Sequence, residues 1–279
     1  MDSKIEINFI KCRLCKGDAF YKFSEKVLNK FNIKFYECEK CNSLQTEEPY
    51  WLNQAYEDWL TKYDTGVFAR VDKTSLISLI ICKIFKFKNL LDVGGGDGLF
   101  CRIMRDYFIN CYSQDKFSKN VYAKEFTEPN FKDADLLTSF EVIEHFSHPE
   151  KEFDNLFKSN PKMVLLTTVI YNNQDQKWNY LELDTGQHIF FYSKRALKLI
   201  GEKYDYDVNF LESGFTLMIS KQFEYKKIFL FLLKKIIVRE KMFYLLRFIK
   251  MFFNSTGYSE DYDYVKNKLK NIEINNKHL

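Results

Sequence analysis

The chain has 279 residues, 46% of them hydrophobic, and a formal net charge of +4 at pH 7. This length and composition can bury one large α/β core together with smaller attachments. Residues 1–11 carry charge and lack a long apolar centre, and no uncharged apolar run approaches the roughly 18 residues of a membrane span. We therefore expect a cytoplasmic protein with no secretory leader, no membrane-spanning helix and no structural disulfides.

Two CxxC pairs stand near the start of the chain: Cys12, Cys15, Cys38 and Cys41. β-like segments at 19–23 and 33–36 lie between the pairs. Four thiolates at this spacing are typical of a tetrahedral Zn²⁺ site, and closing the loop stabilises a small domain. The alternatives are a redox dithiol and an iron–sulfur cluster, but the thioredoxin-like pattern of a redox pair is missing. We predict a structural zinc ribbon over residues 1–48, with no chemistry at a metal whose four positions are filled.

Helical spacing of aromatic and apolar residues predicts a helix over 49–65, and a second helix is expected at 75–85. These elements form a helical lead-in, residues 49–88, to a larger domain that we expect to end at residue 221.

A glycine-rich stretch, LLDVGGGDG at 90–98, follows a β-like run at 89–93 and precedes a helix-like segment at 99–107. A strand, a glycine turn and a helix N-terminus form the nucleotide-binding corner of a doubly wound α/β sheet. The spacing is not G-x-G-x-x-G, and the carboxylates of Asp92 and Asp97 flank the loop. These carboxylates suit a cationic ligand better than a pyrophosphate. S-adenosylmethionine (SAM) is such a ligand, because it carries a sulfonium and an ammonium.

The residues that we assign to this cofactor are Asp92, Gly94, Gly95, Gly96, Gly98, Asp115 and Glu141. Asp115 ends the next β-like run, 109–114, about 20 residues after the loop, where such folds hold ribose hydroxyls. The alternative is a glycine-rich turn that binds no ligand.

Three segments and one residue together resemble class I SAM-dependent methyltransferases: 90–98, ADLLTSFEVIEH at 134–145, MVLLTTVI at 163–170 and Asp115. The resemblance covers residues 60–221 and implies a Rossmann-like sheet of seven strands, with the turn after the fourth strand, where Glu141 lies, bordering the donor pocket. The chain departs from the family between Lys119 and Lys132, where a longer strand and helix are common.

Residues 178–193, WNYLELDTGQHIFFYS, follow the fifth predicted strand, and ligands in open α/β sheets bind beyond the carboxyl ends of strands. Imidazole accepts a proton near neutral pH, which makes His188 the first candidate for a base. The stretch GQHIFFYSKRAL resembles zinc-bearing methyltransferases that act on nucleotide-linked deoxysugars. That resemblance implies a sugar or sugar-nucleotide acceptor of surface-polysaccharide synthesis, although the residue before the histidine is Gln187 where those enzymes have an acid. The alternative is a core-facing histidine that caps a strand.

A second group, Glu141, Glu144 and His145, follows the fourth predicted strand. We assign Glu144 and His145 to the catalytic residues, with His145 as the second candidate base. Glu-x-x-His also occurs as a metal pair in helical bundles, but no second such pair exists here, so the sequence predicts no catalytic metal.

The last part of the domain should hold a helix at 193–204, capped by Ser193, and a closing hairpin of 206–211 with 215–220. Residues 222–279 read as a basic helical tail. Within it, 226–250 holds eight basic residues and one glutamate on an amphipathic helix. Such a helix lies on an anionic membrane, here the inner face, or contacts a partner protein, or packs on its own sheet. Residues 260–279 are expected to fray.

We therefore predict a methyltransferase with an α/β fold, SAM as the donor, structural zinc and a small polar acceptor. Two other functions are open to the sequence. The first is an RNA methyltransferase whose ribbon contacts nucleic acid, which the acidic residues within 1–60 disfavour. The second is a non-catalytic scaffold with the same fold.

Overall fold

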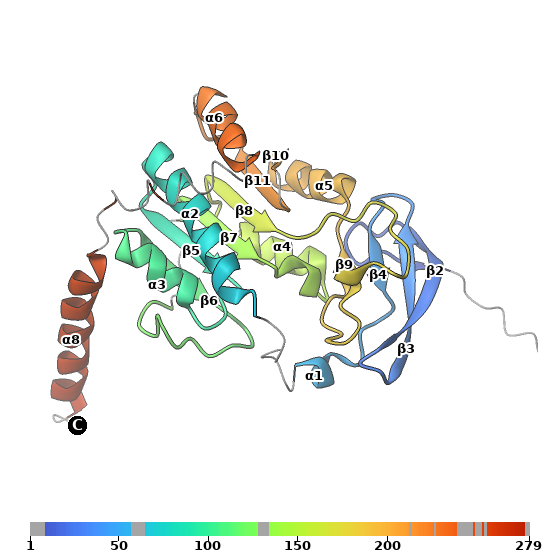
Figure 1. The fold of residues 1–279 in the computed structure, drawn as a ribbon, viewed down its shortest axis with the longest axis horizontal. Coiled ribbons are helices and arrows are strands. Elements are labelled where there is room, and N and C mark those ends of the chain that lie inside the picture. Colours follow the sequence, from blue (N-terminus) through green and yellow to red (C-terminus); the bar gives the residue numbers. More distant parts are fainter. Residues whose placement is uncertain are drawn as a thin grey trace, which may run out of the picture. The chain divides into compact units, whose positions relative to one another are not determined.

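The computed structural model describes residues 9–56, 65–127, 134–211, 214–225, 227–238, 248, 253 and 256–276. The chain forms two compact units (Figure 1). The first unit consists of Met1–Thr65, Ser139–Asn160 and Val164–Phe223, and the second of Gly66–Thr138, Pro161–Met163 and Glu224–Leu279. The predicted domain boundaries after residues 48 and 221 stay predictions.

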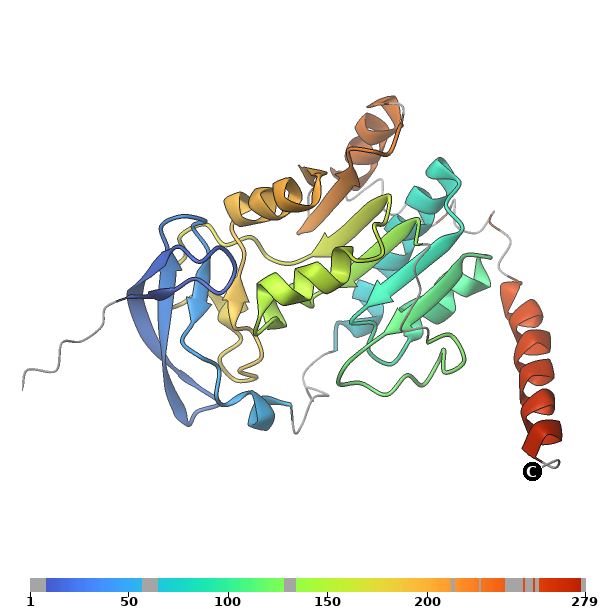
Figure 2. The same cartoon turned by 180° about the vertical axis from the view of Figure 1, so that it is seen from behind.

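A five-stranded sheet has the order β1-β2-β3-β4-β9. Its strands are β1 (Phe9–Lys11), β2 (Asp18–Val27), β3 (Phe31–Cys38), β4 (Leu44–Thr46) and β9 (Phe190–Phe191). The predicted strands at 19–23 and 33–36 are confirmed within β2 and β3, which pair antiparallel with a bulge near Tyr21. In Figure 2, β9 lies beside the strands of the N-terminal segment. A two-residue strand from the far end of the first unit thus completes this sheet.

The core of this sheet is aromatic and aliphatic. Phe23, Phe35 and Phe191 pack together, with the rings of Phe23 and Phe35 stacked at 4.9 Å. Trp51 belongs to the same cluster and donates its indole N–H to the carbonyl of Gly186 at 2.8 Å. Burial of side chains from both ends of the first unit therefore holds β9 in place.

A six-stranded sheet has the order β10-β11-β8-β7-β5-β6. Its strands are β5 (Asn89–Val93), β6 (Asn110–Gln114), β7 (Leu136–Phe140), β8 (Met163–Thr167), β10 (Tyr206–Phe210) and β11 (Phe215–Ser220). β5 pairs parallel with β6 and β7, whereas β10 and β11 pair antiparallel as the predicted hairpin. This mixed sheet with its helices is the α/β fold that the sequence predicts.

The described part of the chain holds six strands of this sheet where seven were expected. Residues 115–127 follow β6 and contain no strand, which is where the sequence departs from the resembling family. Residues 128–133 lie outside the described ranges.

The helices are α1 (Leu52–Ala55), α2 (Val67–Phe85), α3 (Leu99–Asp106), α4 (Pro149–Phe157), α5 (Lys194–Tyr204), α6 (Lys227–Val238) and α8 (Gly257–Asn276), with 3₁₀ turns η1 (Ile143–His145) and η2 (Asn179–Leu181). Ser193 caps α5 as predicted, because its hydroxyl accepts from the amide of Ala196 at 3.0 Å. The helix predicted at 49–65 is described only as α1, since 57–64 lie outside the described residues.

The basic stretch 226–250 is described as α6 and the single residue Phe248, and the rest of it lies outside the described residues. Its predicted contact with a membrane or a partner therefore stays a prediction. Among the residues that the structure covers, no helix combines the length and apolarity needed to cross a bilayer.

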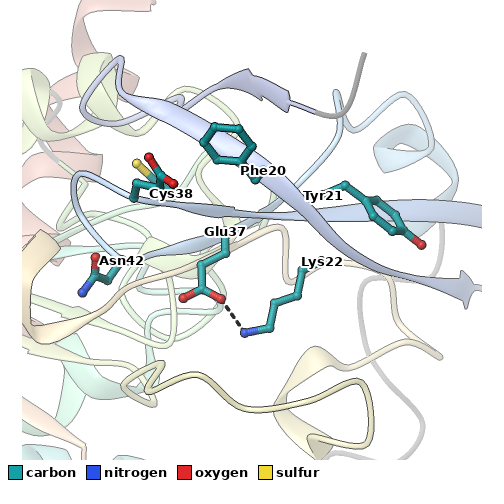
Figure 3. Close-up of a pocket in the computed structure, with 7 residues that line it drawn as sticks. Phe20, Tyr21, Lys22, Glu37, Cys38 and Asn42 are labelled. Atoms are coloured by element: carbon teal, nitrogen blue, oxygen red, sulfur yellow. Dashed lines mark hydrogen bonds and ion pairs between the residues drawn. The ribbon is translucent and has the colours of Figure 1, made fainter. Parts of the chain in front are cut away.

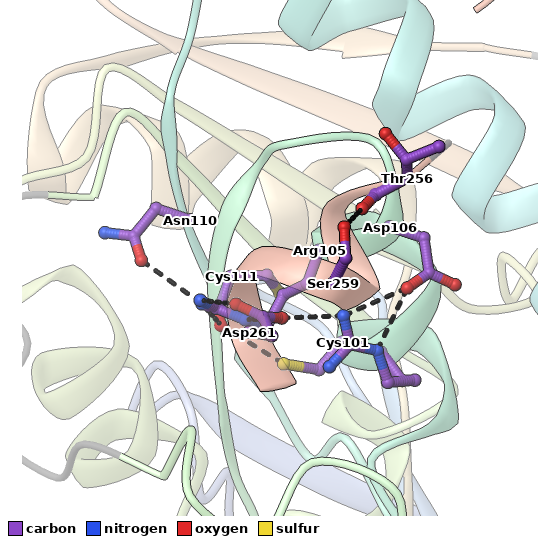
Figure 4. Close-up of polar contacts among 9 residues, drawn as sticks. Cys101, Arg105, Asp106, Asn110, Cys111, Thr256, Ser259 and Asp261 are labelled. Carbon is purple, nitrogen blue, oxygen red and sulfur yellow. Dashed lines mark hydrogen bonds and ion pairs between the residues drawn. The ribbon is translucent and has the colours of Figure 1, made fainter. Parts of the chain in front are cut away.

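The expectation that residues 260–279 fray is wrong for most of that segment, because α8 continues to Asn276. Asp261 anchors this helix to α3 (Figure 4). Its carboxylate accepts from Arg105 at 2.7 and 2.8 Å and from Arg102 at 2.6 Å. The backbone approaches closely at Gly257, where an added Cβ would lie 2.2 Å from the carbonyl oxygen of Arg105. The ion pairs of Asp261 with Arg102 and Arg105 thus hold α8 against α3, and no pattern in the sequence predicted them.

We expect Asp261→Asn to destabilise the second unit by roughly 1.5–3 kcal/mol at pH 7. Burial favours the neutral form of Asp261, but the hydrogen bonds and charges of Arg105 and Arg102 outweigh it and lower its pKa. A lowered folded pKa stabilises above the unfolded value of about 3.9, and this contribution disappears as the pH falls through the folded pKa. Thermal unfolding of wild type and variant should therefore converge in acid. The exposed Asp263→Asn is the control, and an equal loss in both variants would refute the anchor.

Candidate functional site

The four predicted cysteines come together in the first unit. Their sulfur atoms all lie within 4.8 Å of one another, with Cys12 and Cys41 at 3.7 Å and Cys15 and Cys38 at 3.5 Å. Sulfurs around a tetrahedral zinc ion with bonds of about 2.3 Å lie about 3.8 Å apart. None of the four cysteines forms a disulfide, so all four sulfur atoms are available to a metal. The donor set fits zinc.

Cys82, Cys101 and Cys111 are buried, as the sequence predicts. A shallow hollow of about 270 Å³ lies on the ribbon next to Cys38, lined by Phe20, Tyr21, Lys22, Glu37, Cys38, Glu39 and Asn42 (Figure 3). The ammonium of Lys22 pairs there with Glu37 and donates to the Tyr171 hydroxyl at 2.5 Å. The Lys22 ammonium is therefore already paired within the hollow.

The glycine-rich loop after β5 lies in the second unit. The backbone turns at Gly98, where φ is 86° and an added Cβ would lie 2.4 Å from the amide oxygen of Asn120. At Gly95 an added Cβ would lie 2.2 Å from the Ser113 hydroxyl and 2.4 Å from Oδ2 of Asp92. The side chains of Asn120, Ser113 and Asp92 thus leave little room for a Cβ at these two positions, and the contact of the loop with a ligand stays a prediction.

Three buried polar atoms beside this loop lack a hydrogen-bond partner within the described residues: Oδ2 of Asp92, the Ser113 hydroxyl and the amide nitrogen of Asn120. Oδ1 of Asp92 accepts from Thr138 at 2.8 Å. Burial raises the pKa of Asp92 to about 7, with the hydrogen bond from Thr138 opposing and the charge of Asp115 adding to the shift. Orphaned buried polar groups are rare. A ligand that carries a donor for the Asp92 carboxylate, such as a cation, and an acceptor for the Asn120 amide would satisfy them.

Asp115, the predicted ribose ligand, follows β6 directly. Its Oδ2 accepts from the amide of Gly96 at 3.0 Å, and its Oδ1 accepts from Phe117 and Ser118 at 2.8 and 2.7 Å. Each carboxylate oxygen has two lone pairs, so Oδ2 keeps acceptor capacity for a hydroxyl. The Asp115 carboxylate therefore lies against the glycine loop. The seven residues assigned to the cofactor divide between the two units, because only Glu141 belongs to the first.

The predicted catalytic residues form one cluster in the first unit. Ligating atoms of Glu144, His145 and His188 lie within 4.8 Å of one another, and the two imidazole rings are 5.0 Å apart. One backbone hydrogen bond and one side-chain hydrogen bond join their segments. The amide of Ile189 donates to the carbonyl of Glu144 at 3.0 Å, and the Tyr192 hydroxyl donates to that of Ile143 at 3.0 Å.

Two carboxylates in this cluster share the hydroxyl of Tyr180. It bonds Oε1 of Glu144 and, at 3.2 Å, Oε2 of Glu141. Glu144 is fully buried, and its second oxygen has no partner in the described part of the chain. Burial, followed by the charge of Glu141, raises the pKa of Glu144 to about 8. Glu141 adopts a left-handed backbone with φ of 53°, an uncommon conformation that occurs at functional turns.

Both histidines are neutral at pH 7. Burial, with a smaller contribution from His188, lowers the pKa of His145 to about 3, and burial also lowers the pKa of His188. Nδ1 of His188 lies 2.7 Å from the carbonyl oxygen of Tyr180, and a carbonyl only accepts. Nδ1 therefore carries the hydrogen, and the lone pair sits on Nε2, as a base requires.

Sequence reasoning missed Tyr180, Tyr56 and Trp178. The Tyr56 hydroxyl contacts Nδ1 of His145 at 3.0 Å. The Tyr180 ring lies 4.5 Å from that of His188 and 5.4 Å from that of Trp178. The aromatic run at 178–193 indicated the right segment, but nothing in its spacing distinguishes a tyrosine at the cluster from one in the core.

The strand, the glycine loop and the helix, with an acid after the next strand, are features of an α/β protein with a parallel sheet. Residues 65–209 match the family model described as "Methyltransferase domain". This match spans more than half of the 279 residues, and the chain belongs to that family of methyltransferases. No curated protein sequence matches the chain significantly.

Solved structures give weak similarities. The methyltransferase domain of bacterial CtHen1-C has 17% identity and a TM-score of 0.38, covering 54% of this chain and 98% of its own. Magnesium protoporphyrin IX methyltransferase from Synechocystis PCC 6803 with bound SAH has 10% identity and a TM-score of 0.45, covering 62% and 98%. Human N-acetylserotonin methyltransferase in complex with SAM has 12% identity and a TM-score of 0.37, covering 53% and 51%. Values this low leave the family match as the basis of the assignment.

Proposed function

We propose that the protein transfers a methyl group from SAM to a small polar acceptor, a sugar or sugar nucleotide of surface-polysaccharide synthesis. The donor assignment rests on one observation, the group of orphaned polar atoms beside the glycine loop. Asp92 and Ser113 offer oxygens, and Asn120 offers an amide, beside a loop in which the space next to Gly96 is open. A methionine ammonium is a suitable partner for the buried Asp92 carboxylate.

In this proposal residues 94–98 hold the methionine end of SAM, and Asp115 accepts from a ribose hydroxyl through Oδ2. Glu141 is the further residue that we assign to the donor. Bound SAM supplies an electrophilic methyl group, whose carbon bonds to the acceptor oxygen as its bond to sulfur breaks and the electron pair stays on sulfur.

The chain's own contribution at the acceptor is positioning and proton transfer. Nε2 of His188 takes the hydroxyl proton, while the bond from Nδ1 to Tyr180 fixes the ring and stabilises the imidazolium that forms. Glu144 and His145 complete the catalytic group. Trp178 and Tyr180 supply aromatic faces beside His188, and such faces suit the apolar side of a sugar ring.

Structural zinc in the Cys12–Cys15–Cys38–Cys41 cluster completes the proposal. Its four thiolates leave no open position, so the metal stabilises the fold. The ribbon's contacts support this role: the Arg13 guanidinium donates to the carbonyl of Ile189 at 2.6 Å, one residue after His188.

The cofactor assignment is tested by Asp115→Ala. We expect weaker SAM binding by calorimetry, because the substitution removes the ribose acceptor and the oxygen that holds the amide of Gly96. Asp207→Ala, at an exposed position on β10, is the matched control. Unchanged SAM affinity in Asp115→Ala would remove Asp115 from the site, and absence of binding to wild type would leave a non-catalytic scaffold.

The acceptor is identified by incubating the purified protein with SAM and a panel of nucleotide sugars, followed by mass spectrometry. A gain of one methyl group on a sugar supports the proposed class. Methylation of RNA alone in a parallel incubation would replace the sugar with a nucleic acid.

A further inference from the structure

The cluster of Glu144, His145 and His188 has the composition of a metal site. It contains one carboxylate and two imidazoles, and one ligating atom of each residue lies within 4.8 Å of the others. Metal ions with bonds of about 2.0–2.2 Å hold neighbouring ligand atoms about 3–4 Å apart. Small side-chain adjustments therefore bring these three atoms to coordination distance.

The second nitrogen of each histidine is engaged as in metal centres. Nδ1 of His188 donates to the carbonyl of Tyr180, and Nδ1 of His145 lies 3.0 Å from the Tyr56 hydroxyl. Metal-ligating histidines are oriented in this way by a partner on the other ring nitrogen. The carbonyl fixes the lone pair of His188 on Nε2, and the Tyr56 hydroxyl, which donates and accepts, is compatible with the same tautomer of His145.

The cluster also lacks positive charge. Glu144 is fully buried with one oxygen unpartnered, and the single hydroxyl proton of Tyr180 is shared between Glu144 and Glu141. Within the described ranges, no lysine or arginine forms an ion pair with either glutamate. An ionised carboxylate at this buried position would require a compensating partner, and a cation at the two imidazoles would supply it.

We propose that Glu144, His145 and His188 bind a divalent first-row transition-metal ion. Two imidazoles and a carboxylate suit such ions and leave coordination positions open. The site depends only on these three residues. Its role, to hold and polarise the oxygen of the acceptor, rests on the proposed methyl transfer. A bound cation takes the Nε2 lone pair that serves as the base in the metal-free enzyme, so polarisation by the metal then replaces the imidazole base.

Mn²⁺ is the probe for this site, because it prefers nitrogen and oxygen ligands and leaves the four thiolates of the ribbon to zinc. Titration of the full zinc-loaded chain, followed by electron paramagnetic resonance of free Mn²⁺, should show one bound ion per chain. Glu144→Gln, His145→Ala and His188→Ala should each weaken binding by roughly tenfold or more. His148→Ala and Glu202→Gln, at exposed positions, are matched controls that keep wild-type affinity. Circular dichroism verifies that each variant is folded.

Failure to bind Mn²⁺, or equal binding by wild type and a folded His188→Ala variant, overturns the proposed site. A methyl-transfer assay on the same samples separates this result from failure of the proposed function. Transfer at the same rate with and without Mn²⁺ removes the cation's role and leaves methyl transfer standing. Specific Mn²⁺ binding with no SAM binding retains the site and removes the proposed function.

Discussion

Replacing His188 with alanine is expected to lower the rate of methyl transfer by roughly 10²–10⁴, with SAM affinity nearly unchanged. The reason is the geometry of the ring. Its Nδ1 is fixed on the carbonyl of Tyr180 at 2.7 Å, which leaves Nε2 as the nitrogen that we propose to take the acceptor proton. The donor residues Asp92 and Asp115 belong to the other compact unit. Turnover with a fixed acceptor and calorimetry with SAM measure the two effects separately.

His148→Ala provides the matched control, because this histidine is exposed and lies three residues beyond His145. We expect its turnover to equal that of wild type. A folded His188→Ala variant that turns over at the wild-type rate shows that the histidine has the structural role that the sequence left open. A variant that loses SAM binding in parallel instead places His188 in the donor pocket.

Removal of the proposed zinc ion is expected to lower the stability of the protein more than the His188→Ala substitution does. Structural zinc contributes on the order of 10 kcal/mol of binding free energy in zinc-finger peptides, which is comparable to the whole stability of many domains. We expect Cys38→Ser to lose the metal, to lower the unfolding temperature of the first unit markedly and to reduce methyl transfer. Elemental analysis, near-ultraviolet circular dichroism and the turnover assay follow the three changes.

The loss of activity follows from the contacts between the ribbon and the segment after His188. The carbonyl of Ile189 accepts from the amide of Thr46 at 3.1 Å and from Arg13 at 2.6 Å, and Gln45 pairs with Phe190. Cys82→Ser, a buried cysteine outside the cluster, controls for the substitution itself. A zinc-free Cys38→Ser protein with normal stability and turnover would show that the metal has no structural role.

The local elements could be predicted from the sequence because their signals are local. The alternation at 19–23, the apolar run before the glycines and Ser193 at a helix start each indicate the element that the structure contains. The same holds for the glycine loop, whose carboxylate neighbours are adjacent in sequence. Within the helix predicted over 49–65, Leu52–Ala55 is helical, and residues 57–64 lie outside the described ranges.

Contacts between distant segments could not be predicted in this way. Neither the pairing of β4 with β9 nor the anchoring of α8 by Asp261 leaves a periodic signal, since both depend on the tertiary fold. The same reason explains why the sequence predicts no metal at Glu144 and His145. The local spacing around Glu144 and His145 does not point to His188, which the fold brings to them from a remote loop.

The pairing of β4 with β9 also limits how this protein can be rearranged. A chimera that exchanges only residues 1–48 with a relative would separate Leu44 and Gln45 from their partners Phe191 and Phe190. The exchanged module would then present an unpaired edge, the kind of surface on which chains aggregate. Grafting has to move both stretches of the chain at once, so the amino-terminal module and the strand that follows His188 form one transferable piece.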